Sequence, residues 1–369
     1  MTLASLAGRL TAGLTTRAAL GMRPLTAPVI IFISLGFLIS PQVLGFLPAT
    51  ALAGLDVVVS IGLATLGVFI GLAVGREGMA ARRLFVAASV EGCITIAIVA
   101  WAVIALLGVW QLPTNLPPVL VAMALGLCAS ASAAPATDSD GDAAERVAGR
   151  VADLDDVLPI VLGGGLIVLA GPTPRSALDG ALLTIVLGLA IGVAGWLLIE
   201  RAEGAAERGV FIIGCLALLG GCAAYLGLSP LLTGLAAGWL WVLAPGRCDL
   251  LMAGELRKVQ HPLIVLLLIA TGASLEPSLA GVWLFAPYLV FRLAGKLIGG
   301  WTASRIAAGV APSDLGSYLI PPGVIGVAFA LNLNQVTHGD AGAIIFAVAL
   351  GALASELLAL FVTPRHGTA

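Results

Sequence analysis

The stretch Ala152-Asp153-Leu154-Asp155-Asp156-Val157-Leu158-Pro159 places two adjacent carboxylates, those of Asp155 and Asp156, at the start of an apolar run over 160–170. A charged side chain at bilayer depth costs roughly 2.5–3.5 kcal/mol even on the most lenient insertion scale, so a pair of them indicates a functional site. Neighbouring residues on an α-helix point about 100° apart. One carboxylate can therefore meet a partner helix while the other faces a cavity.

The composition of the chain is that of a membrane protein. Its residues are 60% hydrophobic and 10% charged, and its mean hydropathy is +1.09. Soluble domains carry about 25% charged residues, so the sequence predicts an all-α polytopic membrane protein. The net charge is −2, and the charged residues lie between apolar runs, so the sequence holds no basic patch that would favour nucleic acid as a partner.

A transmembrane helix needs about 20 apolar residues. That criterion predicts twelve spans in one transmembrane domain over 28–363, with 1–27 as a short cytoplasmic lead-in and 364–369 as a cytoplasmic tail. The predicted spans are 28–47, 52–74, 84–109, 118–137, 146–171, 178–199, 209–227, 229–245, 262–276, 281–304, 313–333 and 341–363.

The distribution of basic residues predicts the orientation of these spans. With the N-terminus inside, cytoplasmic loops and tails hold 15 of the 18 Lys and Arg residues. These are Arg9, Arg17, Arg23, Arg76, Arg82, Arg83, Arg146, Arg150, Arg201, Arg208, Arg247, Arg257, Lys258, Arg305 and Arg365. Such a bias is typical of cytoplasmic loops, so both termini are expected in the cytoplasm.

Two predicted spans are interrupted. The fourth changes from leucine-rich helix to small, hydroxylated and Pro-containing sequence over 125–138, and Pro321-Pro322-Gly323 interrupts the eleventh. Interrupted helices in corresponding halves are typical of transporters built from inverted repeats. The expected repeats are 28–171 and 229–363, with 178–227 as a linker. The alternative explanation is that Pro and Gly are simply commoner in membrane helices.

Buried charges in other spans provide partners for the aspartate pair. Lys296 lies mid-span, and a lone ammonium in hydrocarbon needs a carboxylate, for which Asp155 and Asp156 are the obvious source. Arg292 lies one turn earlier and either serves the pair or reaches the outer interface. Glu91 either belongs to a proton path or pairs with Arg292. The competing interpretation makes 138–156 an acidic cytoplasmic loop.

Short motifs along nearly the whole chain then resemble one family, the bacterial monovalent cation:proton antiporters of the second superfamily, sodium/proton exchangers with the NhaA-like fold. The combination of two aspartates with a buried lysine is the specific part of the resemblance. The matching segments are 36–45, 66–72, 154–158, 227–238, 270–275 and 295–296. The fourth span reads Ala-Ser-Ala-Ser at 129–132, where the family usually has Thr-Ser or Thr-Asp.

The resemblance implies roles for individual residues. Asp156 would bind the monovalent cation or the proton, and Asp155 would pair with Lys296. Ser130 and Ser132 would line the site, and two broken helices would cross beside it. Further implications are a homodimer in the lipid bilayer of the bacterial inner membrane, with no resident cofactor and no enzymatic activity.

A carboxylate in a partly desolvated cavity can hold either a proton or a hard cation, so mutual exclusion at Asp156 provides exchange of sodium, potassium or lithium for protons. With two acids and one lysine, we expect electrogenic exchange by alternating access. Two alternatives remain, a sodium-coupled organic-anion symporter of similar inverted-repeat fold and a channel-like cation conductor. An intramembrane aspartyl protease is excluded because adjacent acids on one helix cannot face one water molecule.

Overall fold

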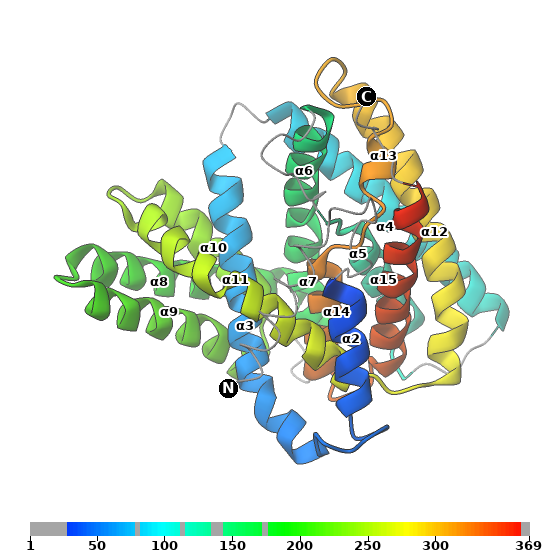
Figure 1. Cartoon of the computed structure of the whole chain (residues 1–369), viewed down its shortest axis with the longest axis horizontal. Coiled ribbons are helices and arrows are strands. Elements are labelled where there is room, and N and C mark those ends of the chain that lie inside the picture. Colours follow the sequence, from blue (N-terminus) through cyan, green and yellow to red (C-terminus); the bar gives the residue numbers. More distant parts are fainter. Residues whose placement is uncertain (1–27, 78–81, 111–114, 134–142, 172–175, 363–369) are drawn as a thin grey trace, which may run out of the picture.

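A computed structural model describes residues 28–77, 82–110, 115–133, 143–171 and 176–362, and the predicted lead-in and tail lie outside these ranges. The described ranges form helices without any strand (Figure 1). In chain order, the helices are α2 (Pro28–Ile39), α3 (Ala49–Glu77), α4 (Arg82–Trp110), α5 (Pro118–Ser130), α6 (Ala143–Asp155), α7 (Val157–Ala170), α8 (Ala177–Arg201), α9 (Ala205–Tyr225), α10 (Pro230–Leu243), α11 (Cys248–Ala273), α12 (Leu279–Ile306), α13 (Leu315–Tyr318), α14 (Val324–Val336) and α15 (Gly342–Val362).

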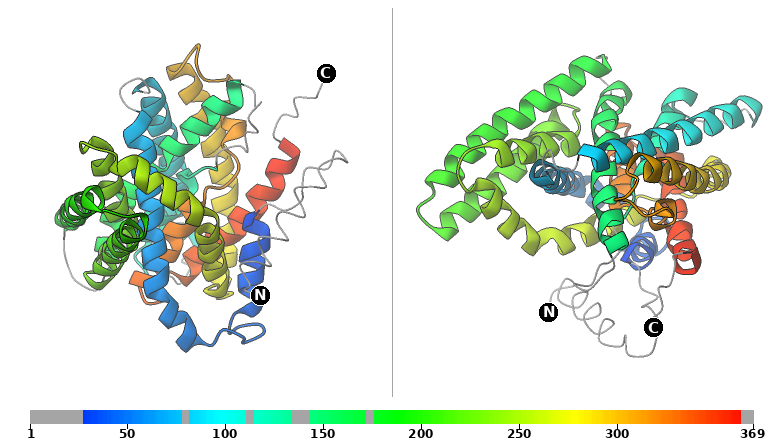
Figure 2. Two further views of the ribbon diagram at one scale, coloured as in Figure 1. Left: turned by 60° about the vertical axis from the view of Figure 1, so that its left-hand side comes forward. Right: turned by 90° about the horizontal axis from the view of Figure 1, so that it is seen from above.

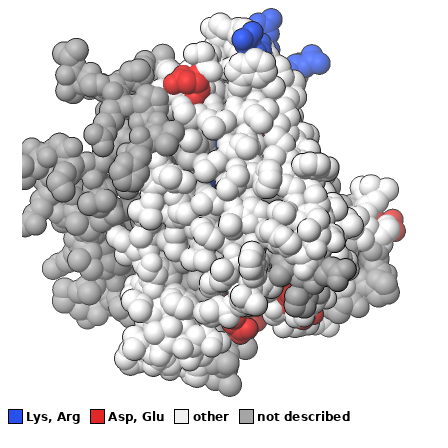
Figure 3. Space-filling view, turned by 90° about the vertical axis from the view of Figure 1, so that its right-hand side faces the viewer, with Lys and Arg blue, Asp and Glu red and all other residues white. Residues whose placement is uncertain are grey.

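The outer surface of the helices is apolar. Six of the described helices are long and apolar enough to cross a membrane. Large hydrophobic side chains point outward from them, such as Trp101, which is 71% exposed, and Val186, which is 58% exposed. In Figure 3 the middle of the visible face carries no charged side chain, while Lys and Arg gather at one end. An uncharged belt of this kind is the surface expected against lipid.

Two helices are broken where the sequence predicted it. α5 ends at Ser130 and continues as extended chain, and a non-helical segment separates α13 from α14. The two extended segments run antiparallel: Ala133 N donates to Pro321 O at 3.0 Å, and Gly323 N donates to Ala131 O at 3.3 Å. The segments therefore satisfy part of each other's freed backbone groups, which is a requirement for broken helices at membrane depth.

The packing of the helices follows the predicted two-fold repeat. α2 packs against α11, and α3 packs against α10, which are equivalent pairs when α2–α7 is matched to α10–α15. α4 packs against α12, its own counterpart, and the broken α5 packs against α14. Figures 1 and 2 show α8 and α9 side by side, projecting from the rest of the molecule next to α10. The predicted inverted-repeat fold with two crossing broken helices is confirmed.

Three predicted spans differ from the helices. The first was expected over 28–47, but α2 ends at Ile39. The ninth was expected over 262–276, but α11 begins at Cys248 and passes through Pro262, so that Arg257 and Lys258 lie in a helix and not in a loop. Proline is tolerated inside membrane helices, and α11 continues across Pro262 although the side chains over 257–262 are exposed. The fifth span was expected as one helix, but it is divided at Asp156 into α6 and α7.

Glycines allow the paired helices to approach backbone to backbone. A Cβ atom added at Gly36 of α2 would meet the backbone of Ile269, and one added at Gly272 of α11 would meet the backbone of Ile33. Between α3 and α10, Gly67 faces the Leu231 carbonyl and Gly234 faces the Ala64 carbonyl. Small residues at such crossings are how membrane helices pack closely without a hydrophobic driving force.

We predict that Gly234→Ala lowers the free energy of unfolding by about 1–3 kcal/mol, because the new methyl group would overlap the Ala64 carbonyl oxygen. The melting temperature of the purified protein in detergent measures this loss. Gly214→Ala is the matched control, since an added Cβ at that exposed position of α9 has no atom within 4 Å. The control should melt at the wild-type temperature or slightly above it, and equal melting of all three proteins would contradict the close packing.

Candidate functional site

The candidate site is built around Lys296 of α12, whose side chain is fully buried. Two glycines on the same helix bring α4 close to it. A Cβ added at Gly295 would lie 3.0 Å from Thr95 Cα, and one added at Gly299 would lie 2.9 Å from the Glu91 carbonyl oxygen. The small residues around Lys296 therefore hold Glu91 and Thr95 within reach of its ammonium group.

Two buried carboxylates share the Lys296 ammonium. Lys296 Nζ lies 3.1 Å from Glu91 Oε1 on α4 and 3.2 Å from Asp155 Oδ2 at the end of α6. All three side chains are fully buried. Lys296 Nζ also donates to the Ser130 carbonyl at the C-terminal end of α5. The helix dipole makes such an end partly negative, so the ammonium is surrounded by acceptors on three sides.

Hydroxyl groups bind the same carboxylates. Ser132 Oγ donates to Asp155 Oδ2 at 2.8 Å, and Thr95 Oγ1 donates to Glu91 Oε1 at 2.9 Å. Ser130 differs from Ser132, because its hydroxyl donates to the Leu127 carbonyl at 3.0 Å within its own helix. Ser130 thus offers only its carbonyl to the site, whereas Ser132 offers its hydroxyl.

Asp156 lies at the break between α6 and α7, directly before the first residue of α7. It is half-buried, while Asp155 beside it is fully buried. The Oδ1 atoms of both residues are inaccessible to solvent and have no hydrogen-bond partner among the described residues. The backbone of Asp156 is itself right-handed helical, and Ile160 N donates to its carbonyl at 3.3 Å, so the interruption is confined to one residue.

The structure brings most of the predicted site residues together, and Arg292 lies apart from them. Asp155, Lys296, Ser132 and the Ser130 carbonyl form one connected cluster, and Asp156 adjoins it through the chain. Glu91 was predicted to pair with Arg292 or to serve a proton path, and the structure pairs it with Lys296. A role for Glu91 in a proton path stays a prediction.

Arg292 does not reach the outer interface, and a role in serving the aspartate pair stays a prediction. It is 1% exposed, and it donates hydrogen bonds to the carbonyls of Ala131 and Ile320 and to the hydroxyl of Ser355. Thr95 was missed by the sequence reasoning. Its spacing of four residues from Glu91 was the available signal, since such residues share one helix face.

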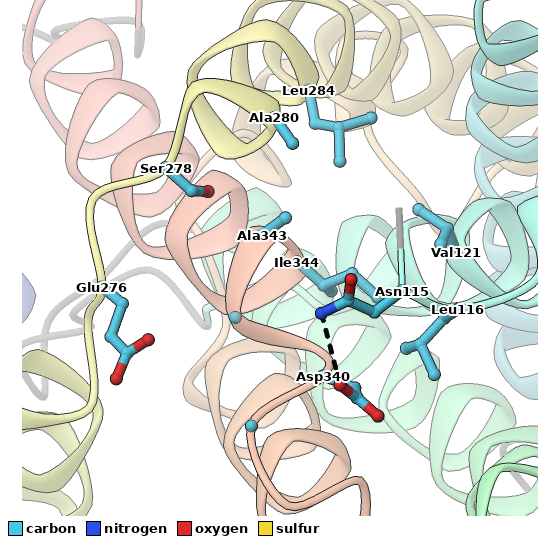
Figure 4. Close-up of a pocket in the computed structure, with 12 residues that line it drawn as sticks. Asn115, Leu116, Val121, Glu276, Ser278, Ala280, Leu284, Asp340, Ala343 and Ile344 are labelled. Atoms are coloured by element: carbon cyan, nitrogen blue, oxygen red, sulfur yellow. Dashed lines mark hydrogen bonds between the residues drawn. The ribbon is translucent and has the colours of Figure 1, made fainter. Parts of the chain in front are cut away.

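A cavity lies away from this cluster. It has a volume of about 240 Å³ and lies where α5, α12 and α15 begin (Figure 4). Its polar lining is Asn115, Glu276, Ser278 and Asp340, and Asn115 Nδ2 donates to Asp340 Oδ1 at 3.2 Å. None of the predicted site residues lines this cavity.

A comparison with solved structures finds the same arrangement of helices. The chain superposes on the sodium proton antiporter MjNhaP1 from Methanocaldococcus jannaschii at pH 8 with a TM-score of 0.68 and 16% sequence identity. The match covers 97% of each of the two chains.

The chain has the fold of a sodium/proton antiporter. The resemblance first drawn from short motifs is thereby confirmed for the fold. No family model matches the sequence, and no curated protein matches it. With its apolar helices, the antiporter fold identifies an integral membrane protein. This likeness concerns the fold and does not assign roles to individual residues.

We predict that Lys296→Met destabilises the antiporter fold by about 3–5 kcal/mol, because it leaves the carboxylates of Glu91 and Asp155 buried without a cation. The melting temperature in detergent measures the effect. Adding Glu91→Gln and Asp155→Asn to the variant removes the uncompensated charges and should restore much of the loss.

The only other lysine of the chain provides the control for this prediction. Lys258 pairs with Glu255, but the two side chains are 67% and 45% exposed. An exposed pair contributes at most about 1 kcal/mol, so Lys258→Met should melt close to the wild type. Equal melting of Lys296→Met and Lys258→Met would show that the buried cluster does not support the fold.

Proposed function

We propose that this protein exchanges a monovalent cation, sodium or potassium with lithium as an analogue, for protons across the membrane. The observation that carries the proposal is the pair of buried, unpartnered carboxylate oxygens of Asp155 and Asp156. They lie at the crossing of two broken helices in a fold shared with a sodium proton antiporter. Carboxylate, hydroxyl and carbonyl oxygens are the ligands that hard cations prefer.

Proton and cation compete for the same oxygens in this proposal. Asp156, which is half-buried, is the group that meets the incoming ion, and Asp155 is held in place by Lys296 and Ser132. A carboxylate cannot hold a proton and a cation on one oxygen at the same time. Loading with a cation therefore requires release of a proton, and exchange follows from this exclusion.

The helix packing supports alternating access. Every proposed site residue lies on the bundle formed by α4–α7 and α12–α15, while close glycine contacts join α2 to α11 and α3 to α10. We propose that the first group of helices moves against the second and turns the site from one side of the membrane to the other. Rigid contacts within the second group suit a stationary scaffold.

The number of charges favours electrogenic exchange. Two buried acids, Glu91 and Asp155, contact the ammonium group of Lys296, and the half-buried Asp156 follows Asp155 in the chain. If Lys296 keeps its charge throughout, both aspartates can release protons while one cation binds. We further propose a homodimer in a bacterial inner membrane with both termini cytoplasmic, as the basic end in Figure 3 favours.

We predict that Asp156→Asn abolishes exchange, because the amide neither releases a proton nor binds a cation by charge. The measurement uses proteoliposomes with an imposed pH gradient, in which a pH dye reports collapse of the gradient on addition of sodium, lithium or potassium. Asp314→Asn, which changes an exposed carboxylate just before α13, is the control and should retain exchange. Exchange by Asp156→Asn at the wild-type rate would contradict the proposal that Asp156 binds the cation and the proton.

We predict different effects for the two serines. Ser132→Ala removes the hydroxyl that donates to Asp155 and should raise the apparent KM for the cation roughly tenfold, the weight of one hydrogen bond to a charged group. Ser130→Ala leaves the carbonyl that Lys296 contacts and should change KM by less than about threefold. Initial rates over a cation series in the same vesicles distinguish the two, and equal effects would contradict the assigned contacts.

A further inference from the structure

Arg292 is a buried charge whose bonds go to the broken helices themselves. Its guanidinium Nη1 donates to the Ile320 carbonyl at 2.8 Å and to Ser355 Oγ at 3.1 Å, and Nη2 donates to the Ala131 carbonyl at 3.3 Å. One side chain of α12 thus reaches the extended segment after α5, the segment between α13 and α14, and α15.

The hydrogen bonds of this guanidinium go mainly to backbone carbonyls, and the carboxyl group of Glu356 on α15 interacts with its charge from beyond ion-pair distance. Among the described residues, no carboxylate lies within ion-pair distance of Arg292. Its partners Ala131 and Ile320 follow the C-terminal ends of α5 and α13, where unpaired carbonyls gather. Only arginine presents several donors in one rigid plane, so a single residue can bind both segments.

The Ala131 carbonyl connects Arg292 to the ion site. That oxygen accepts from Arg292 Nη2 and also from Gly323 N of the crossing segment. The residues on either side of Ala131 are the two serines of the site: the Ser130 carbonyl accepts from Lys296, and the Ser132 hydroxyl donates to Asp155. A shift of the Ala131 carbonyl would therefore displace both contacts together.

We infer that Arg292 is a positioning residue, which clamps the two extended segments at their crossing and thereby sets the geometry of Ser130 and Ser132 against Lys296 and Asp155. It takes no proton and touches no ion. Since a guanidinium stays protonated at any physiological pH, this role differs from a step in a proton path. The contact of Arg292 with the two segments does not depend on the proposed function. Its effect on cation binding does, because that effect assumes that the cation binds at this site.

The test compares Arg292→Gln, Arg292→Lys and Ser355→Ala with the wild type in proteoliposomes. Arg292→Gln should raise the apparent KM for the cation roughly tenfold or more, because two carbonyls lose a charged donor, while the pH at half-maximal rate stays unchanged. Arg292→Lys keeps the positive charge but loses the planar arrangement of donors. Its KM should therefore lie between the KM of the wild type and that of Arg292→Gln. Ser355→Ala keeps both carbonyl bonds and should change KM by less than about threefold.

Hydrogen exchange of the backbone provides a measurement that does not depend on transport. In Arg292→Gln, peptides that contain the amides of Ala133 and Gly323 should exchange faster than in the wild type, while peptides from α8 and α9 should be unchanged. This comparison keeps the inference testable if the wild type itself moves no cation, an outcome that would contradict the proposed function alone.

Three results would overturn the role of Arg292. One is unchanged exchange of the Ala133 and Gly323 amides in Arg292→Gln. Another is full recovery of KM by Arg292→Lys, which would show that charge alone matters. The third is a shifted pH profile with an unchanged KM, which would show that Arg292 acts on the titration of the site and not on its geometry.

Discussion

The burial of the Lys296 ammonium is the constraint on which the rest of this structure depends. A buried ammonium without partners costs several kcal/mol, and here it contacts Glu91, Asp155 and the Ser130 carbonyl from three different elements. These contacts fix how α4, α6 and the end of α5 meet α12. The same contacts leave one oxygen of Asp155 without a partner, so the interaction that stabilises the bundle also shapes its polar centre.

Arg292, the second basic residue in the middle of α12, stabilises the broken helices. Breaking two helices inside a membrane frees carbonyl groups that no water can reach. The extended segments bind part of these groups by pairing with each other, and Arg292 binds the Ala131 and Ile320 carbonyls. The two cations lie one turn apart on a single helix and have different partners. Lys296 binds two carboxylates and the Ser130 carbonyl, whereas Arg292 binds the Ala131 and Ile320 carbonyls.

The close helix pairs place this polar centre within a rigid frame. Backbone contacts at glycine join α2 to α11 and α3 to α10, and none of the proposed site residues lies on those four helices. The charges of the site therefore gather in the bundle of α4–α7 and α12–α15. Large hydrophobic side chains cover the exposed surface, while the charged side chains of the site are fully or half buried.

The sequence by itself determined the class of the protein, the two broken segments and the identity of the central residues. Apolar runs of membrane length, the interruption at Pro321-Pro322-Gly323 and the rarity of buried charge are local properties, and each is readable without coordinates. The start of α11 at Cys248 and the break at Asp156 were not readable, because proline is tolerated inside membrane helices and an apolar run does not mark where a helix is interrupted. Only the tertiary structure decided which acid meets which base. Glu91 and Arg292 lie 201 positions apart, as near in sequence as Glu91 and Lys296, and the choice between them depends on how α4 crosses α12 at Gly295 and Gly299.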